Sequence, residues 1–274
     1  MIVVATETDL KEEIIKLGPW HLEVEVTPGL STRAWLDAPP GSYPESLGRT
    51  NFQAPRRSFR ELMQAVYPEG LGGRAVLDCA CNCGAYVFWA RELGAGRCFG
   101  FDVREHWIHQ ARFLQKHRAV GDEGLRFEVL DLYELPGKGL EPFDVTLFNG
   151  IFYHLPEPVG GVRIAAELTK ELIMVDTATR ADREDGMLAV GAESREQVMS
   201  GVHGLMWRPT GPRVLERILS HVGFEETALV DWKRETVAPG WGRLQMLGSK
   251  KPGLLAGFQE RLASISEERA AGEG

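Results

Sequence analysis

The residues best suited to bind a nucleoside lie where an apolar run ends in a turn of small residues. Residues 75–86 read AVLDCACNCGAY, in which the turn contains Ala80, Asn82 and Gly84. Small residues let the backbone approach a ligand, and the helix-like stretch that follows offers unpaired N–H groups to a carboxylate or phosphate. Asp78 lies in this run, and Asp102 ends the next one, close to the ~20-residue spacing at which a carboxylate accepts hydrogen bonds from a ribose. The pattern predicts a nucleoside-containing ligand.

Reactive side chains also follow a later apolar run. Residues 148–155 read FNGIFYHL, so that Asn149 ends the run while Tyr153 and His154 come directly after it. An imidazole can accept a proton near neutral pH, which makes His154 a candidate general base and Tyr153 the competing candidate. A structural role, in which His154 hydrogen-bonds a neighbouring carbonyl, has equal weight.

From residue 69 onward, strand-like runs alternate with helix-like windows, which is typical of βαβ units around a parallel, doubly wound sheet. The expected strands are Arg74–Cys79, Gly96–Asp102, Leu125–Val129, Phe143–Phe148, Leu172–Asp176, Glu226–Trp232 and Arg243–Gly248. The expected helices are Tyr86–Leu93, Glu105–His117, Pro158–Leu168 and Thr210–Val222. Open α/β sheets bind ligands at the carboxyl ends of their strands, where the candidate residues above are found.

The chain is expected to have three parts: an N-terminal extension at 1–60, a doubly wound domain at 61–250, and a C-terminal helix with a frayed tail at 251–274. The extension begins with an amphipathic helix that Gly18-Pro19 ends, and it continues as a short hairpin with a Pro-Gly turn. Its later part is rich in Pro, Gly, Ser and Arg. Because such a segment can order over a site, Trp20, Tyr43 and Arg49 are predicted to close the acceptor pocket as a lid.

The composition is that of an ordinary globular protein, with 43% hydrophobic and 26% charged residues among 274. The 31 basic and 39 acidic residues give a formal charge of -8, which disfavours a surface that binds phosphate backbones throughout. No apolar stretch is long enough for a membrane span, and the N-terminus turns acidic too early for a secretory signal. We therefore expect a cytoplasmic protein that does not bind membranes.

The four cysteines, Cys79, Cys81, Cys83 and Cys98, are expected to be free thiols. Alternating cysteines in a strand lack the two-residue spacing of a zinc knuckle, so we expect buried thiols and no metal.

The turn at 78–84 resembles motif I of the class I S-adenosylmethionine-dependent methyltransferases, roughly Asp/Glu-x-Gly-x-Gly-x-Gly, with Ala80 and Asn82 in place of two glycines. Asp102 stands in the ribose-binding position, and residues 129–132 (VLDL) stand at the position of the adenine-contacting motif. The resemblance covers residues 69–248. The phrase GIFYHL is similar to the G-x-x-Y-H-L segment of the branch that includes the tRNA wobble-uridine carboxymethyltransferases, and Cys81-Asn82-Cys83-Gly84 is closer to the C-N-x-G of relatives encoded among carbohydrate-biosynthesis genes.

This resemblance implies a Rossmann-like, seven-stranded methyltransferase fold with S-adenosylmethionine as the cofactor. It implies that the cofactor contacts Asp78, Ala80, Asn82, Gly84, Asp102, Asp131, Leu132 and Asn149. The alternative for Asp102 is that it only caps the following helix.

The interpretation favoured by these features is methyl transfer to an oxygen or nitrogen of a small polar molecule, such as a sugar or secondary metabolite. A tRNA nucleoside is the alternative acceptor, with Arg49, Arg56, Arg57 and Arg60 as a local phosphate-binding patch. A non-catalytic nucleoside-binding protein is the third hypothesis, since a fold does not determine function. The sequence carries no signal for the oligomeric state.

Overall fold

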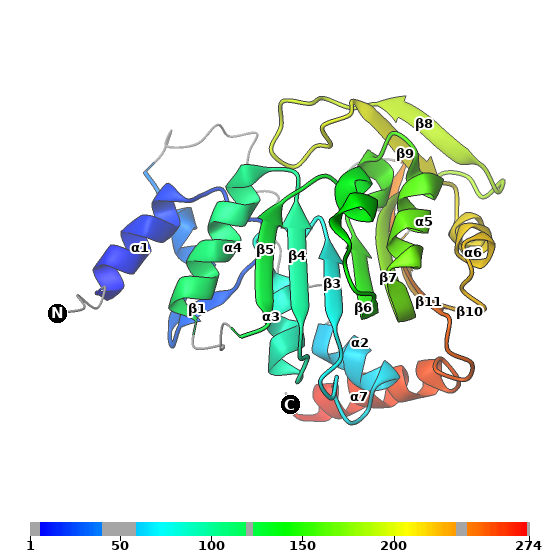
Figure 1. Ribbon diagram of the computed structural model, residues 1–274, viewed down its shortest axis with the longest axis horizontal. Coiled ribbons are helices and arrows are strands. Elements are labelled where there is room, and N and C mark those ends of the chain that lie inside the picture. The colour runs from blue at the N-terminus through cyan, green and yellow to red at the C-terminus, as the bar shows by residue number, and fades with distance from the viewer. Residues whose placement is uncertain (1–5, 40–58, 119–122, 234–239, 273–274) are drawn as a thin grey trace.

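The computed structural model describes residues 6–39, 59–118, 123–233 and 240–272. Its centre is a seven-stranded sheet with the strand order β10-β11-β7-β6-β3-β4-β5 (Figure 1). The strands are β3 (Val76–Cys79), β4 (Cys98–Asp102), β5 (Leu125–Val129), β6 (Phe143–Asn149), β7 (Thr169–Arg180), β10 (Glu226–Lys233) and β11 (Trp241–Ser249). Each expected strand has its counterpart in this sheet, and the expected Rossmann-like fold of the seven-stranded methyltransferase type is confirmed.

The strand directions define where a ligand can bind. Strands β5, β4, β3, β6 and β7 run parallel, whereas β11 is antiparallel to both of its neighbours, β7 and β10. The order of the chain reverses at β3, which has β4 on one side and β6 on the other. A crevice opens at such a switch point, outside the carboxyl ends of the strands, because the connections leave in opposite directions.

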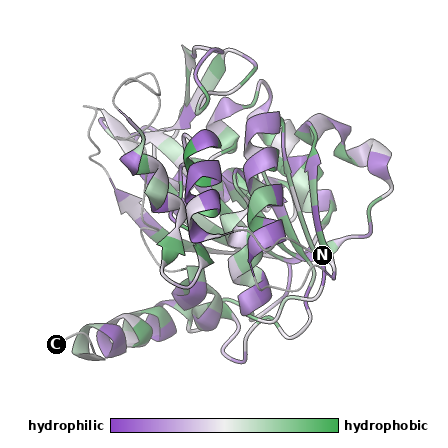
Figure 2. Ribbon diagram, turned by 90° about the vertical axis from the view of Figure 1, so that its left-hand side faces the viewer, coloured by the Kyte–Doolittle hydropathy of each residue, from purple (hydrophilic) through white to green (hydrophobic). Residues whose placement is uncertain are grey.

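Helices cover both faces of the sheet and bury two apolar clusters. The helices of the large domain are α2 (Phe59–Val66), α3 (Ala85–Glu92), α4 (Glu105–His117), α5 (Pro158–Glu167), α6 (Pro212–His221) and α7 (Phe258–Gly272). One cluster joins α2, α3, α4 and α7 to the sheet, and the other joins α5 and α6 to it. Figure 2 shows the hydrophobic colour along the strands and more hydrophilic colour on the helices. This burial on both faces explains why the strands read as nearly continuous apolar runs.

The N-terminal extension packs on the α3/α4 side of the sheet. It contains α1 (Glu7–Lys16), the hairpin strands β1 (Glu25–Thr27) and β2 (Leu30–Ser31), and the 3₁₀ helix η1 (Thr32–Asp37). A capping box at Thr6 begins α1, because the Thr6 side chain and that of Asp9 each accept the other residue's backbone N–H. Apolar residues of the extension belong to the same cluster as those of α3 and α4, so the two parts share one core.

Four of the α-helices and strands differ from the sequence expectations, one of them α2, for which no helix was expected. A hairpin of β8 (Leu188–Ala192) and β9 (Leu205–Pro209) follows β7 and lies above the carboxyl ends of the sheet (Figure 1), in a segment for which no element was expected. Helix α7 continues to Gly272, through most of the segment expected to fray, and runs below the sheet (Figure 1). In the described part of the chain, no helix is both long and apolar enough to cross a membrane.

Candidate active site

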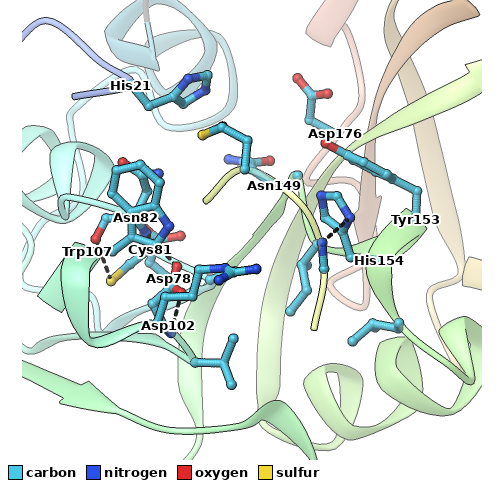
Figure 3. Close-up of a pocket in the computed structure, with 18 of the residues that line it drawn as sticks. His21, Asp78, Cys81, Asn82, Asp102, Trp107, Asn149, Tyr153, His154 and Asp176 are labelled. Atoms are coloured by element: carbon cyan, nitrogen blue, oxygen red, sulfur yellow. Dashed lines mark hydrogen bonds between the residues drawn. The ribbon is translucent and has the colours of Figure 1, made fainter. Parts of the chain in front are cut away.

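A cavity of about 640 Å³ lies at the carboxyl ends of the strands (Figure 3). Its walls come from the ends of β3, β4, β6, β7, β10 and β11 and from the short 3₁₀ helices η3 (Leu132–Lys138) and η4 (Phe152–His154). The loop between β8 and β9 covers it, with residues 198–203 in its lining. The cavity has the size of ordinary small-molecule sites, which range from about 300 to 1,000 Å³.

The turn after β3 adopts a glycine-type backbone without two of the usual glycines. Ala80 and Asn82 both have left-handed dihedrals, with φ of 60° and 52°. Asparagine tolerates this region, and the Asn82 side chain accepts a hydrogen bond from the Cys83 N–H at 2.7 Å. Alanine has no such compensation, so Ala80 carries backbone strain. Both residues line the cavity, as expected for a cofactor turn.

Gly84 has a different role from the one expected. It precedes α3 with φ of 78°, but it is not part of the cavity wall. A Cβ at this position would lie 2.6 Å from the ring of Phe127 and 3.3 Å from Ala111. Gly84 therefore lets the turn pack closely against Phe127 and Ala111. The expectation that it lets a ligand approach the backbone is not supported.

Asp102 is the best-defined polar group at the cofactor end of the cavity. Its carboxylate accepts the backbone N–H of Asn82 at 3.1 Å and that of Arg104 at 3.0 Å. Burial raises the pKa of Asp102 to about 6, although these backbone hydrogen bonds oppose the rise. The helix-capping alternative does not hold, because the N-cap residue of α4 is Arg104 and α4 has no side-chain cap hydrogen bond. Asp102 holds the backbone just before the helix and also lines the cavity, so one carboxylate can hold the backbone and face a ligand.

Three further polar groups expected at the cofactor site line the same cavity. One carboxylate oxygen of Asp78 is buried without a hydrogen-bond partner among the described residues, and burial raises the pKa of this group well above its usual value. Both amide atoms of Asn149 are likewise buried and unpartnered within the described chain. Asp131 and the adjacent Leu132 form another part of the wall. Because buried polar atoms without partners are costly, these groups fit a polar ligand that would satisfy them.

The turn and these unpartnered atoms form a site that fits S-adenosylmethionine. The resemblance to methyltransferases assigns Asp102 to the ribose hydroxyls and Asp131 and Leu132 to the adenine. Asp78 and Asn149 offer a carboxylate and an amide to polar groups of the amino-acid moiety. Each of these residues lines the single cavity described above.

At the other end of the cavity, His154 is held by a carboxylate. Its Nδ1 lies 2.8 Å from Oε2 of Glu193, and the backbone N–H of Gly201 lies 3.0 Å from both of these atoms. Figure 3 shows His154 and Tyr153 on the same side of the cavity, opposite Asp102. Their rings are in contact, with centroids 3.9 Å apart.

Tyr153 contacts a half-buried ion pair. Arg243 donates a hydrogen bond to the Tyr153 hydroxyl at 3.4 Å and forms an ion pair with Asp176. Burial alone would lower the pKa of Arg243, but the Asp176 carboxylate and Tyr153 raise it above its usual value. The guanidinium therefore stays charged, and it orients the tyrosine hydroxyl.

The segment that covers the cavity, residues 193–204, is called the cover loop below. It connects β8 to β9 and was not anticipated from the sequence. Arg104 anchors it, because its guanidinium donates to the carbonyl of Ser200 at 2.8 Å and to that of Arg195 at 3.3 Å. His203 of the loop lies 3.7 Å from Asp131. The only sequence signal for Arg104 was its position two residues after Asp102.

Of the three residues predicted to form a lid in the N-terminal extension, the structure describes Trp20. Trp20 does not line the cavity: it is 1% exposed, its indole N–H donates to the carbonyl of Ile14 at 2.8 Å, and its ring packs on Phe113. The expectation that Trp20 contacts the acceptor is wrong, because the large ring is needed in the shared core. The next residue, His21, lines the cavity instead. Tyr43 and Arg49 lie outside the described residues.

Among the residues that the structure describes, the arginines expected to contact RNA phosphates do not form a basic patch. Arg60 is on α2, which lies below the strands (Figure 1); it does not line the cavity, and it pairs with Glu92 at 3.6 Å. Arg49, Arg56 and Arg57 lie outside the described residues.

The four cysteines are free and buried. Burial raises the pKa of all four thiols, to about 12 for Cys83 and Cys98. No group of three or more metal-binding side chains is found in the described ranges.

Comparison with known proteins shows which class of protein this chain resembles. Residues 72–206 match the family described as "Methyltransferase domain". In fold, the chain is similar to the N-terminal domain of EvdMO1, solved with SAH bound, with a TM-score of 0.66 and 16% identity over 90% of this chain and 98% of that one. Residues 72–206 thus match a methyltransferase domain, in agreement with the fold that the chain shares with EvdMO1.

Within this class, the sequence is similar to proteins named tRNA U34 carboxymethyltransferase. The protein of Ectopseudomonas mendocina (strain ymp) is 30% identical over 192 residues, which are 67% of this chain and 56% of the relative. That of Campylobacter hominis is 36% identical over 93 residues, 34% of this chain and 31% of the relative. The matched part of the chain therefore spans about half of the length of the first of these curated relatives and less of the second.

Proposed function

We propose that this protein transfers a methyl group from S-adenosylmethionine to an oxygen or nitrogen of a small polar molecule, such as a sugar or secondary metabolite. The observation that carries the proposal is a cavity whose lining includes, at one end, the residues that the resemblance assigns to the cofactor and, at the other, His154, which is paired with Glu193. When bound, the cofactor supplies an activated methyl group on a sulfonium. The residues of this chain then need only to position the acceptor, remove water and take up a proton.

His154 is the residue suited to take up that proton. With Nδ1 bound to Glu193, the other ring nitrogen, Nε2, is left to accept the proton that an acceptor hydroxyl or amine loses as its new bond to carbon forms. Tyr153, held by Arg243, is suited to orient the acceptor by a hydrogen bond. The cover loop shields both groups from water, which strengthens such polar interactions.

The composition of the acceptor end supports a small polar substrate. Side chains of both charges and an amide line it, namely Asp176, Asp231, Lys233, Arg243 and Gln245. Such a mixture can donate to and accept from the hydroxyl, amino or carbonyl groups of a polar molecule. It lacks the uniformly basic character that contacts with several phosphates require.

A tRNA nucleoside is the second candidate acceptor, because the curated relatives in the comparison are named as tRNA-modifying enzymes. The formal charge of -8 and the pairing of Arg60 with Glu92 argue against it. These two features weaken long-range attraction to a polyanion, so we rank the small molecule first.

The test is to incubate the full chain with methyl-labelled S-adenosylmethionine and, separately, with a small-molecule extract and bulk tRNA. Label in the small-molecule fraction is the expected result. Label in tRNA, together with salt-sensitive tRNA binding in a gel shift, would establish the alternative. Cofactor binding by calorimetry without transfer to either fraction would support a non-catalytic nucleoside-binding protein.

A further inference from the structure

We propose that Glu193, on the cover loop, is the positioning residue that sets the tautomer of His154. This inference rests on the proposed function, in which Nε2 of His154 accepts the proton of the acceptor. Glu193 follows β8, whereas His154 lies in η4 after β6, so the pair joins two separate parts of the chain.

The hydrogen-bond geometry determines which ring nitrogen carries the proton when the imidazole is neutral. A carboxylate can only accept hydrogen bonds, so a separation of 2.8 Å between Oε2 of Glu193 and Nδ1 of His154 places a proton on Nδ1. The Gly201 N–H lies at hydrogen-bond distance, 3.0 Å, from both Oε2 of Glu193 and Nδ1 of His154, and with Nδ1 protonated it donates to the carboxylate alone. If Nδ1 were unprotonated, two acceptors would share the Gly201 N–H as their only common donor, which is unfavourable.

Burial of both side chains favours the arrangement in which Glu193 and His154 are hydrogen-bonded to each other. The Glu193 side chain is 7% exposed and that of His154 is 16% exposed. A buried carboxylate is costly unless it is hydrogen-bonded, and within the described chain the imidazole is the only ionisable partner at ion-pair distance from Glu193. Glu193 is therefore stabilised by the same contact that orients the ring.

The cover loop must lie close to His154 for this contact to form. A Cβ at Gly201 would lie 2.7 Å from Cβ of His154 and 3.0 Å from its carbonyl oxygen, so glycine permits the approach. The adjacent Ser200 is bound by Arg104, which follows the ribose-binding Asp102 by two residues. One loop thus contacts both the edge of the cofactor site and the proposed base.

The direct test is nuclear magnetic resonance of the full chain labelled with ¹⁵N-histidine, recorded at alkaline pH where the rings are neutral. His154→Gln assigns the signal by its loss. We expect His154 to show the Nδ1–H tautomer in the wild type. In Glu193→Gln, an amide N–H can donate to Nδ1, and in Glu193→Ala the partner is gone, so both variants should gain the Nε2–H tautomer. Glu196→Gln, an exposed change on the same loop, is the matched control and should keep the wild-type spectrum.

A rate measurement separates this inference from the proposed function. With the acceptor fraction that gains label, Glu193→Gln should lower methyl transfer by about tenfold or more and leave the affinity for S-adenosylhomocysteine unchanged. An unchanged tautomer in both folded Glu193 variants would overturn the positioning role, whatever the rate. A changed tautomer in a protein that transfers no label would support the positioning role and refute the proposed function. The Gln variant preserves the shape of the side chain, so the test does not depend on Glu193→Ala folding.

Discussion

The two ends of the cavity are built in different ways. At the cofactor end, the contact between Asn82 and Asp102 joins residues 20 positions apart, one in the turn after β3 and the other at the end of the neighbouring parallel strand β4. At the acceptor end, the contact of His154 with Glu193 spans 39 positions, and that of Tyr153 with Arg243 spans 90. A local turn between strands thus forms the first end, whereas the second depends on folding of the cover loop and of β11. Cofactor binding and methyl transfer should accordingly be separable by mutation.

The largest expected effect is at the acceptor end. His154→Ala should lower turnover by about 100-fold or more, because it removes the group that accepts the proton. Titration calorimetry with S-adenosylhomocysteine should give the wild-type affinity, since His154 lies opposite the cofactor residues. Normal turnover with lower thermal stability would instead make the histidine structural and leave Tyr153 as the candidate.

At the cofactor end, Asp102→Ala should weaken S-adenosylhomocysteine binding by about 1–3 kcal/mol, or roughly 5- to 150-fold, through loss of charge-assisted hydrogen bonds to the ribose. The measurement is calorimetry on a variant shown to be folded by circular dichroism, because Asp102 also holds the backbone of Asn82. Equal affinity of the variant and the wild type would remove Asp102 from the ribose site.

The same carboxylate predicts a pH dependence. Burial raises the pKa of Asp102 to about 6, so the group is ionised at pH 7.5 and mostly protonated at pH ~5. Ligand affinity should therefore fall as the pH decreases through about 6, by up to about tenfold at pH ~5. Binding titrations over this range check it, with Asp102→Asn as the control that should lose the dependence. A flat profile in the wild type would show that the carboxylate charge does not contribute to binding.

The smallest expected effect concerns the strained turn. Ala80→Gly should raise the free energy of unfolding by up to about 1 kcal/mol, since relief of the left-handed strain exceeds the entropy that glycine loses on folding. Urea denaturation monitored by fluorescence measures it. Gly84→Ala should have the opposite effect, because its Cβ meets the Phe127 ring. Destabilisation by Ala80→Gly would mean that the methyl group of Ala80 contributes packing that outweighs the strain.

The sequence predicted the cofactor end better than the acceptor end, for a physical reason. The apolar runs of the parallel strands and the turn at 78–84 are local patterns, so Asp78, Asp102 and Asn149 could be placed at strand ends without knowledge of the fold. The role of Gly84 was misread because the pattern shows that a small residue is needed but does not show whether a ligand or Phe127 lies against it.

The cover loop and Arg243 could not be found in this way. The strands β8 and β9 are for the most part only half-buried, and neither forms a buried apolar run that would predict a strand from the sequence. Glu193 becomes informative only when the fold brings it to His154. Trp20 was assigned to the pocket by its place in a lid-like extension, but burial of its large ring in the core shared with α4 outweighs exposure at a pocket.

The burial of Cys81 lowers the reactivity of its sulfur toward the proposed cofactor. Cys81 lines the cavity that we assign to S-adenosylmethionine, an alkylating agent, and a thiolate is a strong nucleophile toward such a methyl group. Burial, reinforced by the charges of Asp78 and Asp102, raises the pKa of Cys81 well above its usual value, so the sulfur stays protonated and unreactive. Burial therefore keeps Cys81 in its less nucleophilic, protonated form within the cavity.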